Sequence, residues 1–201
     1  MIFPTKSNLI NLKKAIKLSS QGQQLLEKKK VILVKEREKY IDKRNKLKEI
    51  FDSEYKLAFN LLKSANIDIG LNKVNNIAKT MKVYDKINIK YKTVMGVEIP
   101  ILLYEKYINN TDEITFELYD TTISLDETII QFQKLREILI ELTELEIVIE
   151  RLDEAIEKVQ RRSNSLKEII IPKYIKDKKY IEDTLEERER EEFSRLKRLK
   201  K

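Results

Sequence analysis

The sequence has no cysteine and no histidine, and it contains only three glycines and three prolines among 201 residues. The missing thiol and imidazole groups exclude disulfide bonds, thiolate or imidazole catalysis, and the zinc sites that depend on these ligands. So few turn-forming residues leave room for few turns. These absences favour long, uninterrupted secondary structure and leave few routes to catalysis.

Charged residues make up 37% of the chain and hydrophobic residues 41%, with Lys, Glu, Ile and Leu dominant. This composition is typical of long helices that carry one apolar stripe and are otherwise solvated. No apolar run of 18 residues occurs, and no signal peptide precedes the charged start at Lys6. We therefore expect a cytoplasmic protein without direct membrane insertion.

The first helix is predicted to start at Pro4–Ser7 and to run to about Ala65, because no proline follows until Pro100. One apolar row repeats every seven residues along it, with Ser19 as its polar member: Leu12, Leu26, Leu33, Tyr40 and Leu47. At a rise of 1.5 Å per residue, such a helix is about 90 Å long. A helix of this length needs a partner.

The partner helix is predicted from roughly Thr121 to Ile171. Two apolar rows alternate there at spacings of three and four residues over about five heptads, a pattern typical of coiled coils. Ser163 is the one polar member, and Pro172 is predicted to stop or kink the helix before a last helical stretch. The predicted coiled-coil seam consists of Leu135, Ile138, Leu142, Leu145, Ile149, Leu152, Ile156, Val159 and Leu166.

Between the helices the period changes to two, since Ile87–Thr93 alternates apolar or β-branched residues with Lys or Asn. This alternation predicts a strand with one solvent-exposed face, and Gly96 is a candidate turn residue before Pro100. A helix restart is plausible at Thr111. The predicted fold is mainly α: a long antiparallel two-helix coiled coil with a small β-hairpin head inserted at the bend. Its parts are residues 1–66, 67–112 and 113–201, the last kinked near Pro172.

Charge is distributed unevenly along the chain. Residues 1–66 carry 16 basic and 7 acidic side chains, residues 113–157 carry 3 and 13, and residues 158–201 carry 15 and 9. Antiparallel pairing would therefore bring both termini together at a basic end. Such an end could enter an acidic cavity, bind nucleic acid or simply be solvated, and composition alone favours solvation.

Motifs for chemistry are missing from the sequence. There is no GxxxxGK[ST], GxGxxG or GxSxG pattern, and the many carboxylates lie in charged helical runs. The Lys28–Lys30 run has no aromatic ladder beside it, so no nucleic-acid partner is expected. We predict no catalytic residue, no cofactor and no metal site.

Several segments together resemble the D subunit of vacuolar/archaeal-type (V-type/A-type) ATPases. They are Pro4-Thr5 and Gly22–Lys29 near the start, Met95–Pro100 in the middle, and Arg161–Leu166, Ile171-Pro172 and Leu185–Lys197 toward the end. Ser163 stands where the family pattern leads us to expect Val. The resemblance extends over essentially the whole chain.

The resemblance implies a central stalk shaft standing in a threefold ring of catalytic and regulatory subunits, on the cytoplasmic face of the membrane. The head would bind the small F subunit and would sit on the funnel-shaped subunit that couples to the membrane ring. From its own pattern, the strand Ile87–Thr93 could add to a sheet edge of the F subunit or only complete its own hairpin. Candidate ring contacts are Arg161, Arg162, Arg188, Arg190, Arg195 and Lys197. Candidate head contacts with the F subunit are Ile87, Ile89, Tyr91, Met95, Gly96 and Val97.

Two other readings of the pattern remain open. A prefoldin-like chaperone also joins coiled-coil helices through β-hairpins, and a coiled-coil scaffold or nucleic-acid tether would show the same heptads. The sequence leaves open whether the parent complex makes or consumes ATP and whether it moves protons or sodium ions.

Overall fold

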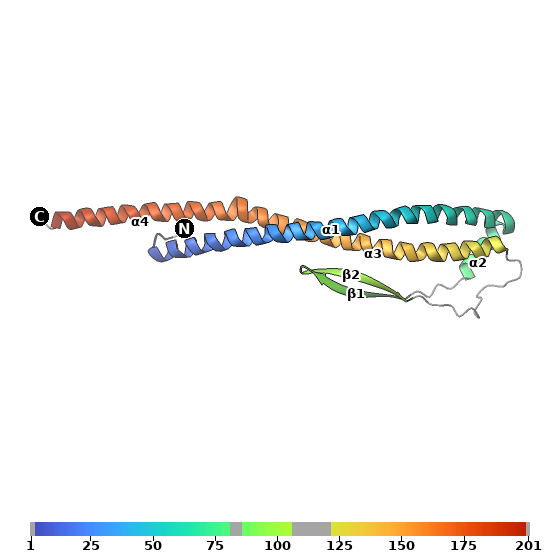
Figure 1. Ribbon diagram of the computed structural model, residues 1–201. Helices are drawn as coiled ribbons and strands as arrows, with labels where there is room; N and C mark the ends of the chain where they lie inside the picture. The colour runs from blue at the N-terminus through green and yellow to red at the C-terminus, as the bar shows by residue number, and fades with distance from the viewer. Residues whose placement is uncertain (1–2, 81–85, 106–121, 200–201) are drawn as a thin grey trace. The chain divides into compact units, whose positions relative to one another are not determined.

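The computed structural model describes residues 3–80, 86–105 and 122–199 of the chain (Figure 1). Its first helix, α1, spans Lys6–Ile69. Thr5 caps this helix, since the Asn8 N–H donates to Thr5 Oγ1 at 3.2 Å. Gly70 ends it with a φ of +92°, a conformation that glycine adopts without steric cost. The predicted start is confirmed, and the helix runs four residues beyond the predicted end at Ala65.

The second helix, α2, spans Leu71–Thr80 directly after the turn at Gly70. It contributes Val74 to a small apolar core that α1 and α3 complete with Ala65 and Leu125. Four half-buried side chains pack around these three: Leu62, Ile69, Ile77 and Ile129. This cluster lets α2 bury its apolar face, because a ten-residue helix alone has marginal stability in water.

The returning part of the chain consists of α3 (Ile123–Ser165), a π-helical turn η1 (Leu166–Ile170) and α4 (Ile171–Leu199). Pro172 was predicted to stop or kink the helix, and a stop is wrong because α4 continues through it. The π-turn supplies the physical reason. The Ile171 N–H donates to Leu166 O, five residues back, and such a wider turn accommodates a ring that would clash with regular helix geometry. The restart expected at Thr111 falls outside the described residues.

A two-stranded antiparallel sheet is formed by β1 (Lys86–Val94) and β2 (Val97–Glu105). Met95 and Gly96 connect the strands with φ values of +51° and +77°, both positive as in a type I′ hairpin turn. The predicted hairpin is therefore confirmed. Pro100 lies within β2 opposite Tyr91 instead of ending the strand.

The chain divides into two compact units, unit 1 (Met1–Val34 and Glu154–Lys201) and unit 2 (Lys35–Asp153). In unit 1, Lys6 Nζ lies 2.9 Å from Glu189 Oε1, and Lys13 Nζ lies 3.0 Å from Glu182 Oε1. Residues later in α1 therefore contact residues earlier in α4. The predicted antiparallel pairing is confirmed within this unit.

Unit 2 shows the same pairing between the later part of α1 and α3. Arg37 Nη1 donates to Asp153 Oδ1 at 2.8 Å, and the Gln131 side chain donates to Glu54. Near Gly70, Ser124 donates to Asp68. Within each unit the two helices therefore lie side by side and run in opposite directions.

The predicted seam residues, eight on α3 and Leu166 in η1, are all buried or half-buried. Leu135, Ile149, Leu152 and Val159 are buried, and the other five are half-buried. Val148 is also buried, with only 1% of its surface exposed, although the two apolar rows leave it out. Burial on α3 therefore extends beyond the strict heptad positions.

Candidate functional site

The described residues contain no group of three or more side chains that could hold a metal ion. None of the helices in these residues is both long and apolar enough to span a membrane. Three features of the described residues are candidates for function: basic side chains in unit 1, a buried polar pair, and exposed apolar side chains on the hairpin.

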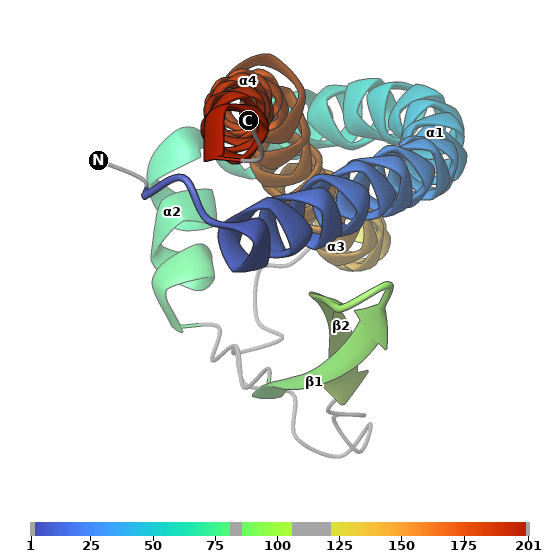
Figure 2. The ribbon, with the colours of Figure 1, turned by 90° about the vertical axis from the view of Figure 1, so that its left-hand side faces the viewer.

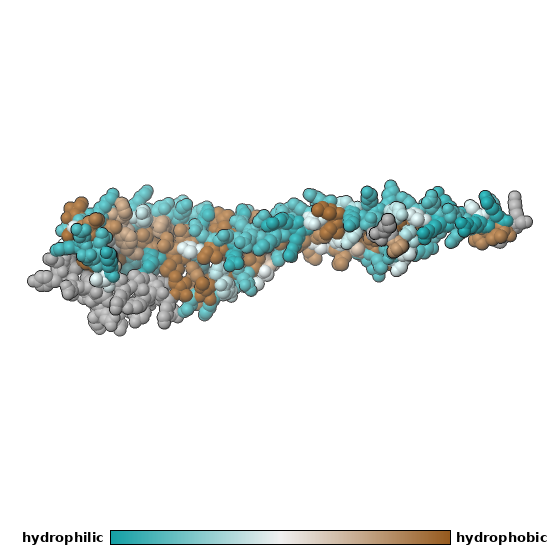
Figure 3. All heavy atoms as spheres, turned by 180° about the vertical axis from the view of Figure 1, so that it is seen from behind, coloured by the Kyte–Doolittle hydropathy of each residue, from teal (hydrophilic) through white to brown (hydrophobic). Residues whose placement is uncertain are grey.

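The first candidate, the basic surface of unit 1, consists of two groups of exposed side chains that lie apart along the chain. Arg161 and Arg162 lie near the end of α3, whereas α4 carries Arg188, Arg190, Arg195 and Lys197. Unit 1 carries 22 basic and 12 acidic side chains, whereas unit 2 carries 19 and 22. Figure 3 shows hydrophilic side chains over much of the visible face, with apolar patches between them. A net charge of +10 gives unit 1 a field that attracts acidic surfaces.

Within the described part of the chain, several of these arginines pair only with the preceding turn of their own helix. Arg161, Arg190 and Arg195 form i,i+4 ion pairs with glutamates at 3.1, 3.1 and 3.8 Å. Exposed pairs of this kind contribute about 0.3–0.5 kcal/mol, so a partner's carboxylate can replace the glutamate at little cost. Within residues 3–80, 86–105 and 122–199, Arg162 and Lys197 form no ion pair at all. The surface is thus available for outside partners.

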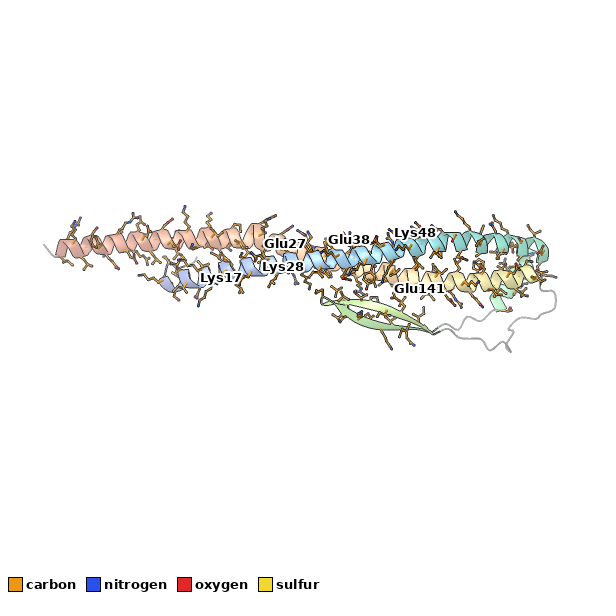
Figure 4. All side chains as sticks on the ribbon, viewed as in Figure 1. Lys17, Glu27, Lys28, Glu38, Lys48 and Glu141 are labelled. Carbon is orange, nitrogen blue, oxygen red and sulfur yellow. The ribbon has the colours of Figure 1, made fainter. Side chains whose placement is uncertain are left out.

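The second feature is a polar pair inside the helix interface of unit 1. Ser163 has only 1% of its surface exposed, and its Oγ donates to Glu27 Oε1 at 2.6 Å. Figure 4 labels Glu27 on α1. The heptads identified Ser163 as a break in the seam, but Glu27 lies 136 residues away and no local pattern connects the two. A single polar contact among apolar neighbours is known to specify the register of a coiled coil.

Ser163→Ala is expected to lower the free energy of unfolding by about 1–2 kcal/mol, because it leaves the Glu27 carboxylate without its donor. The double variant Ser163→Val with Glu27→Leu should recover most of this loss, since an apolar pair replaces both polar partners. Urea unfolding of Ser163→Val, of Glu27→Leu and of the double variant measures the coupling. Unchanged stability of Ser163→Ala would show that water satisfies Glu27.

The ends of the chain in unit 1 are joined by ion pairs that shift pKa values. A hydrogen bond from Lys13, assisted by Lys178, lowers the pKa of Glu182 below its ordinary value of 4.5. A hydrogen bond to Glu189 raises the pKa of Lys6 above its ordinary value of 10.5. Arg188 adds a contact of 3.4 Å to the Pro4 carbonyl. Electrostatics therefore reinforces the pairing of the two termini.

A pH dependence follows from the shift at Glu182. Because its folded-state pKa is lowered, its contribution to stability is fully present above pH 4.5 and is lost as the pH falls through the folded-state value. We expect the acid loss of helicity, followed by circular dichroism, to be less steep in Glu182→Gln than in the unchanged chain. Asp183→Asn, one residue on and exposed, is the matched control. Equal profiles for the three proteins would contradict the assignment.

The third feature is the hairpin, on which Ile87, Ile89, Tyr91 and Met95 are 48%, 53%, 65% and 50% exposed. Gly96 is also exposed and Val97 is half-buried. The alternation in β1 predicted that one face of the strand is exposed to solvent, but the side chains on both faces are exposed over Ile87–Thr93. The buried positions lie on β2 instead, where Ile99 is 3% exposed. The structure thus leaves the predicted head-contact residues accessible.

Figure 2 shows the hairpin beside α3, with β2 nearer to that helix. The contact is made through backbone, since the Leu102 N–H donates to Glu144 Oε2 at 2.9 Å. This bond points away from β1, so one edge of the small sheet is occupied by α3. No described strand pairs with the other edge, which β1 forms.

Comparison with known proteins covers nearly the whole chain. A family profile for the ATP synthase D subunit matches residues 8–201. A V-type ATP synthase D subunit of Thermotoga neapolitana is 37% identical over 199 residues, covering 99% of this chain and 97% of the relative. The A-type ATP synthase D subunits of Thermococcus sibiricus and Pyrococcus horikoshii are 36% and 35% identical, covering 98% and 99% of this chain and 92% and 93% of the relatives. The resemblance predicted from the sequence is confirmed, and the chain belongs to the family of ATP synthase D subunits.

Proposed function

We propose that this protein is the non-catalytic central rotor shaft of a V-type or A-type ATPase. It would couple ATP hydrolysis or synthesis in the catalytic ring to rotation of the ring that translocates protons or sodium ions through the membrane. The observation that carries the proposal is the antiparallel pairing of the chain's two ends in unit 1, shown by the Lys6–Glu189 and Lys13–Glu182 contacts. Paired helices suit torque because their buried side chains are close-packed and resist sliding.

Rotation requires a shaft that presents different sides to its surroundings. The pair of helices in unit 1 is asymmetric, because the two helices differ in sequence and Ser163 with Glu27 interrupts one part of their interface. Each of three catalytic interfaces would meet a different side and prefer a different nucleotide state. Hydrolysis then turns the shaft by changing which state is favoured.

The ring of catalytic and regulatory subunits is the proposed partner of unit 1. Its basic surface offers charges for acidic loops of the ring, foremost Arg161, Arg162 and Arg188 with Arg190, Arg195 and Lys197. Charge-assisted hydrogen bonds from guanidinium groups to carboxylates are directional, so they resist slipping better than point charges do. This contact would act on the cytoplasmic face of the membrane, within a peripheral complex.

The hairpin is the proposed contact with the small F subunit. The part of the chain around the hairpin is the proposed contact with the funnel-shaped subunit. Exposed apolar side chains on β1 and at the turn support the first contact: Ile87, Ile89, Tyr91 and Met95. Met95 also adopts a positive φ, which costs a non-glycine residue energy. A residue held in this conformation at an exposed tip is consistent with a binding role.

The proposal accounts for the family match over residues 8–201, which neither a prefoldin-like chaperone nor a general coiled-coil scaffold explains. Reconstitution of the purified ring with and without this chain provides the test. We expect one copy per ring, ATP turnover that depends on the chain, and rotation of a bead attached to its hairpin. An assembled complex whose bead does not rotate during turnover would contradict the shaft function, and failure to assemble would contradict the partner assignment.

A further inference from the structure

We infer that the outer edge of β1 is a strand-addition site, which takes an extended segment of a neighbouring ATPase subunit with Asp or Glu alternating with apolar residues. The inference rests on the proposed function, because the occupant belongs to the same complex. It assigns a binding mode that the exposed side chains alone do not specify.

The register of the hairpin identifies the backbone groups that point outward. In an antiparallel pair, opposed residues alternate between those that exchange hydrogen bonds and those that do not. Leu102 donates its N–H to Glu144, so Leu102 and its partner Ile89 do not exchange backbone hydrogen bonds with each other. By alternation, the backbone groups that point away from β2 are those of Ile87, Ile89, Tyr91 and Thr93.

Pro100 agrees with this assignment. It lies opposite Tyr91, in a pair that does not exchange hydrogen bonds, so an N–H at this position would point away from β1. A proline inside a strand is tolerated where the absent N–H faces away from the ladder. The β2 edge is therefore closed by α3 and Pro100, and β1 carries the open edge of the described sheet.

Side chains on the open edge indicate the chemistry of the occupant. Ile87, Ile89 and Tyr91 are about half or more exposed and lie on the same residues as the outward backbone groups. Lys90 and Lys92 lie on the opposite face, where the register places Ile101 and Ile99 beside them on β2. Neither lysine has an ion pair with a described residue. An added strand would therefore place acidic side chains next to the lysines and apolar ones next to Ile89 and Tyr91.

The same lysines disfavour a second copy of this chain as the occupant. Two β1 strands paired edge to edge would bring Lys90 and Lys92 of both copies onto one face, and like charges in neighbouring strands destabilise the pairing. Lysine on an edge strand commonly prevents self-association. Here it leaves the edge open to an acidic strand while excluding an identical one.

Residue-resolved amide hydrogen exchange tests the inference in the isolated chain and in the assembled ATPase. We expect exchange at Ile87, Ile89, Tyr91 and Thr93 to slow by roughly tenfold or more on assembly, because each amide gains or neighbours a new hydrogen bond. The amides of Lys90 and Lys92, already bonded to β2, serve as internal references. A chain that assembles while its four outward amides exchange as fast as in the isolated state would overturn the inference and leave the proposed function intact. A chain that does not assemble would overturn both.

A pair of variants separates backbone pairing from side-chain contact. Ile89→Ala keeps the outward N–H, whereas Ile89→Pro removes it at a position where the β1–β2 ladder does not need a donor. In the assembled complex, Ile87 and Tyr91 should stay protected in the alanine variant and lose that protection in the proline variant. Equal protection in the two variants would contradict strand addition. Unchanged exchange at Lys90 and Lys92 verifies that the hairpin itself is intact.

Discussion

Leu152→Ala is expected to lower the free energy of unfolding by about 3 kcal/mol, the largest stability effect of any single change considered for this chain. Leu152 has none of its surface exposed, and it lies on the predicted seam of α3. The truncation removes buried methyl and methylene groups and leaves a cavity, which a close-packed interface fills only in part. Guanidinium unfolding followed by circular dichroism measures the loss.

Leu139→Ala provides the matched control on the same helix. Leu139 is 46% exposed, so its truncation should cost less than about 1 kcal/mol. A difference between the two variants assigns the stability to the interface, because helix propensity changes equally in both. Equal effects would show that the α1–α3 interface does not persist in solution.

Reversal of two charges, Arg161→Glu with Arg162→Glu, is expected to reduce ATP turnover by the assembled complex about tenfold, with little change in the stability of the isolated chain. Both arginines are exposed, and among the described residues Arg161 pairs only with Glu157 on its own helix. The isolated chain therefore loses one weak surface pair, worth about 0.5 kcal/mol or less. In the complex, the new carboxylates would meet the acidic surface that the proposal assigns to the ring.

Lys46→Glu with Lys48→Glu is the control for this reversal. These lysines are exposed on α1 in unit 2, where Figure 4 labels Lys48, and the proposal gives them no ring contact. The control variant changes net charge by the same amount but should retain turnover. Measurements over a range of salt concentrations extend the test, since screening should weaken the effect of the arginine reversal. Equal loss in the two variants would assign the effect to net charge and contradict a specific contact.

Much of the fold follows from periodicity in the sequence. A helix brings residues three and four apart onto one face, so alternating spacings of three and four from Leu135 to Leu166 are sufficient to predict the seam. The alternation from Ile87 to Thr93 predicts a strand for the same reason, with a period of two. The turn at Gly96 was also predictable from the sequence, because glycine tolerates the positive φ that this position adopts. The family resemblance likewise came from residue types and their spacing.

Other features depended on which residues the fold brings together. The heptads could place Ser163 in the interface, but only antiparallel pairing brings Glu27 to its hydroxyl. Burial of Val148, which neither heptad row includes, depends on packing against other parts of the fold, and a single-helix pattern does not contain that information. Continuation of the helix through Pro172 required a π-turn, whose widened hydrogen bond from Ile171 to Leu166 has no distinctive local sequence signal.

The sequence by itself therefore determined the elements: helices from periods of three and four, a hairpin from a period of two, and the absence of thiol and imidazole chemistry from composition. Only the tertiary structure decided that α3 closes the β2 edge through Glu144, while no strand among the described residues pairs with the outer edge of β1. Local patterns depend on a residue's near neighbours along the chain. Edge closure and polar pairing depend on groups many residues apart, whose contact arises only when the chain folds back on itself.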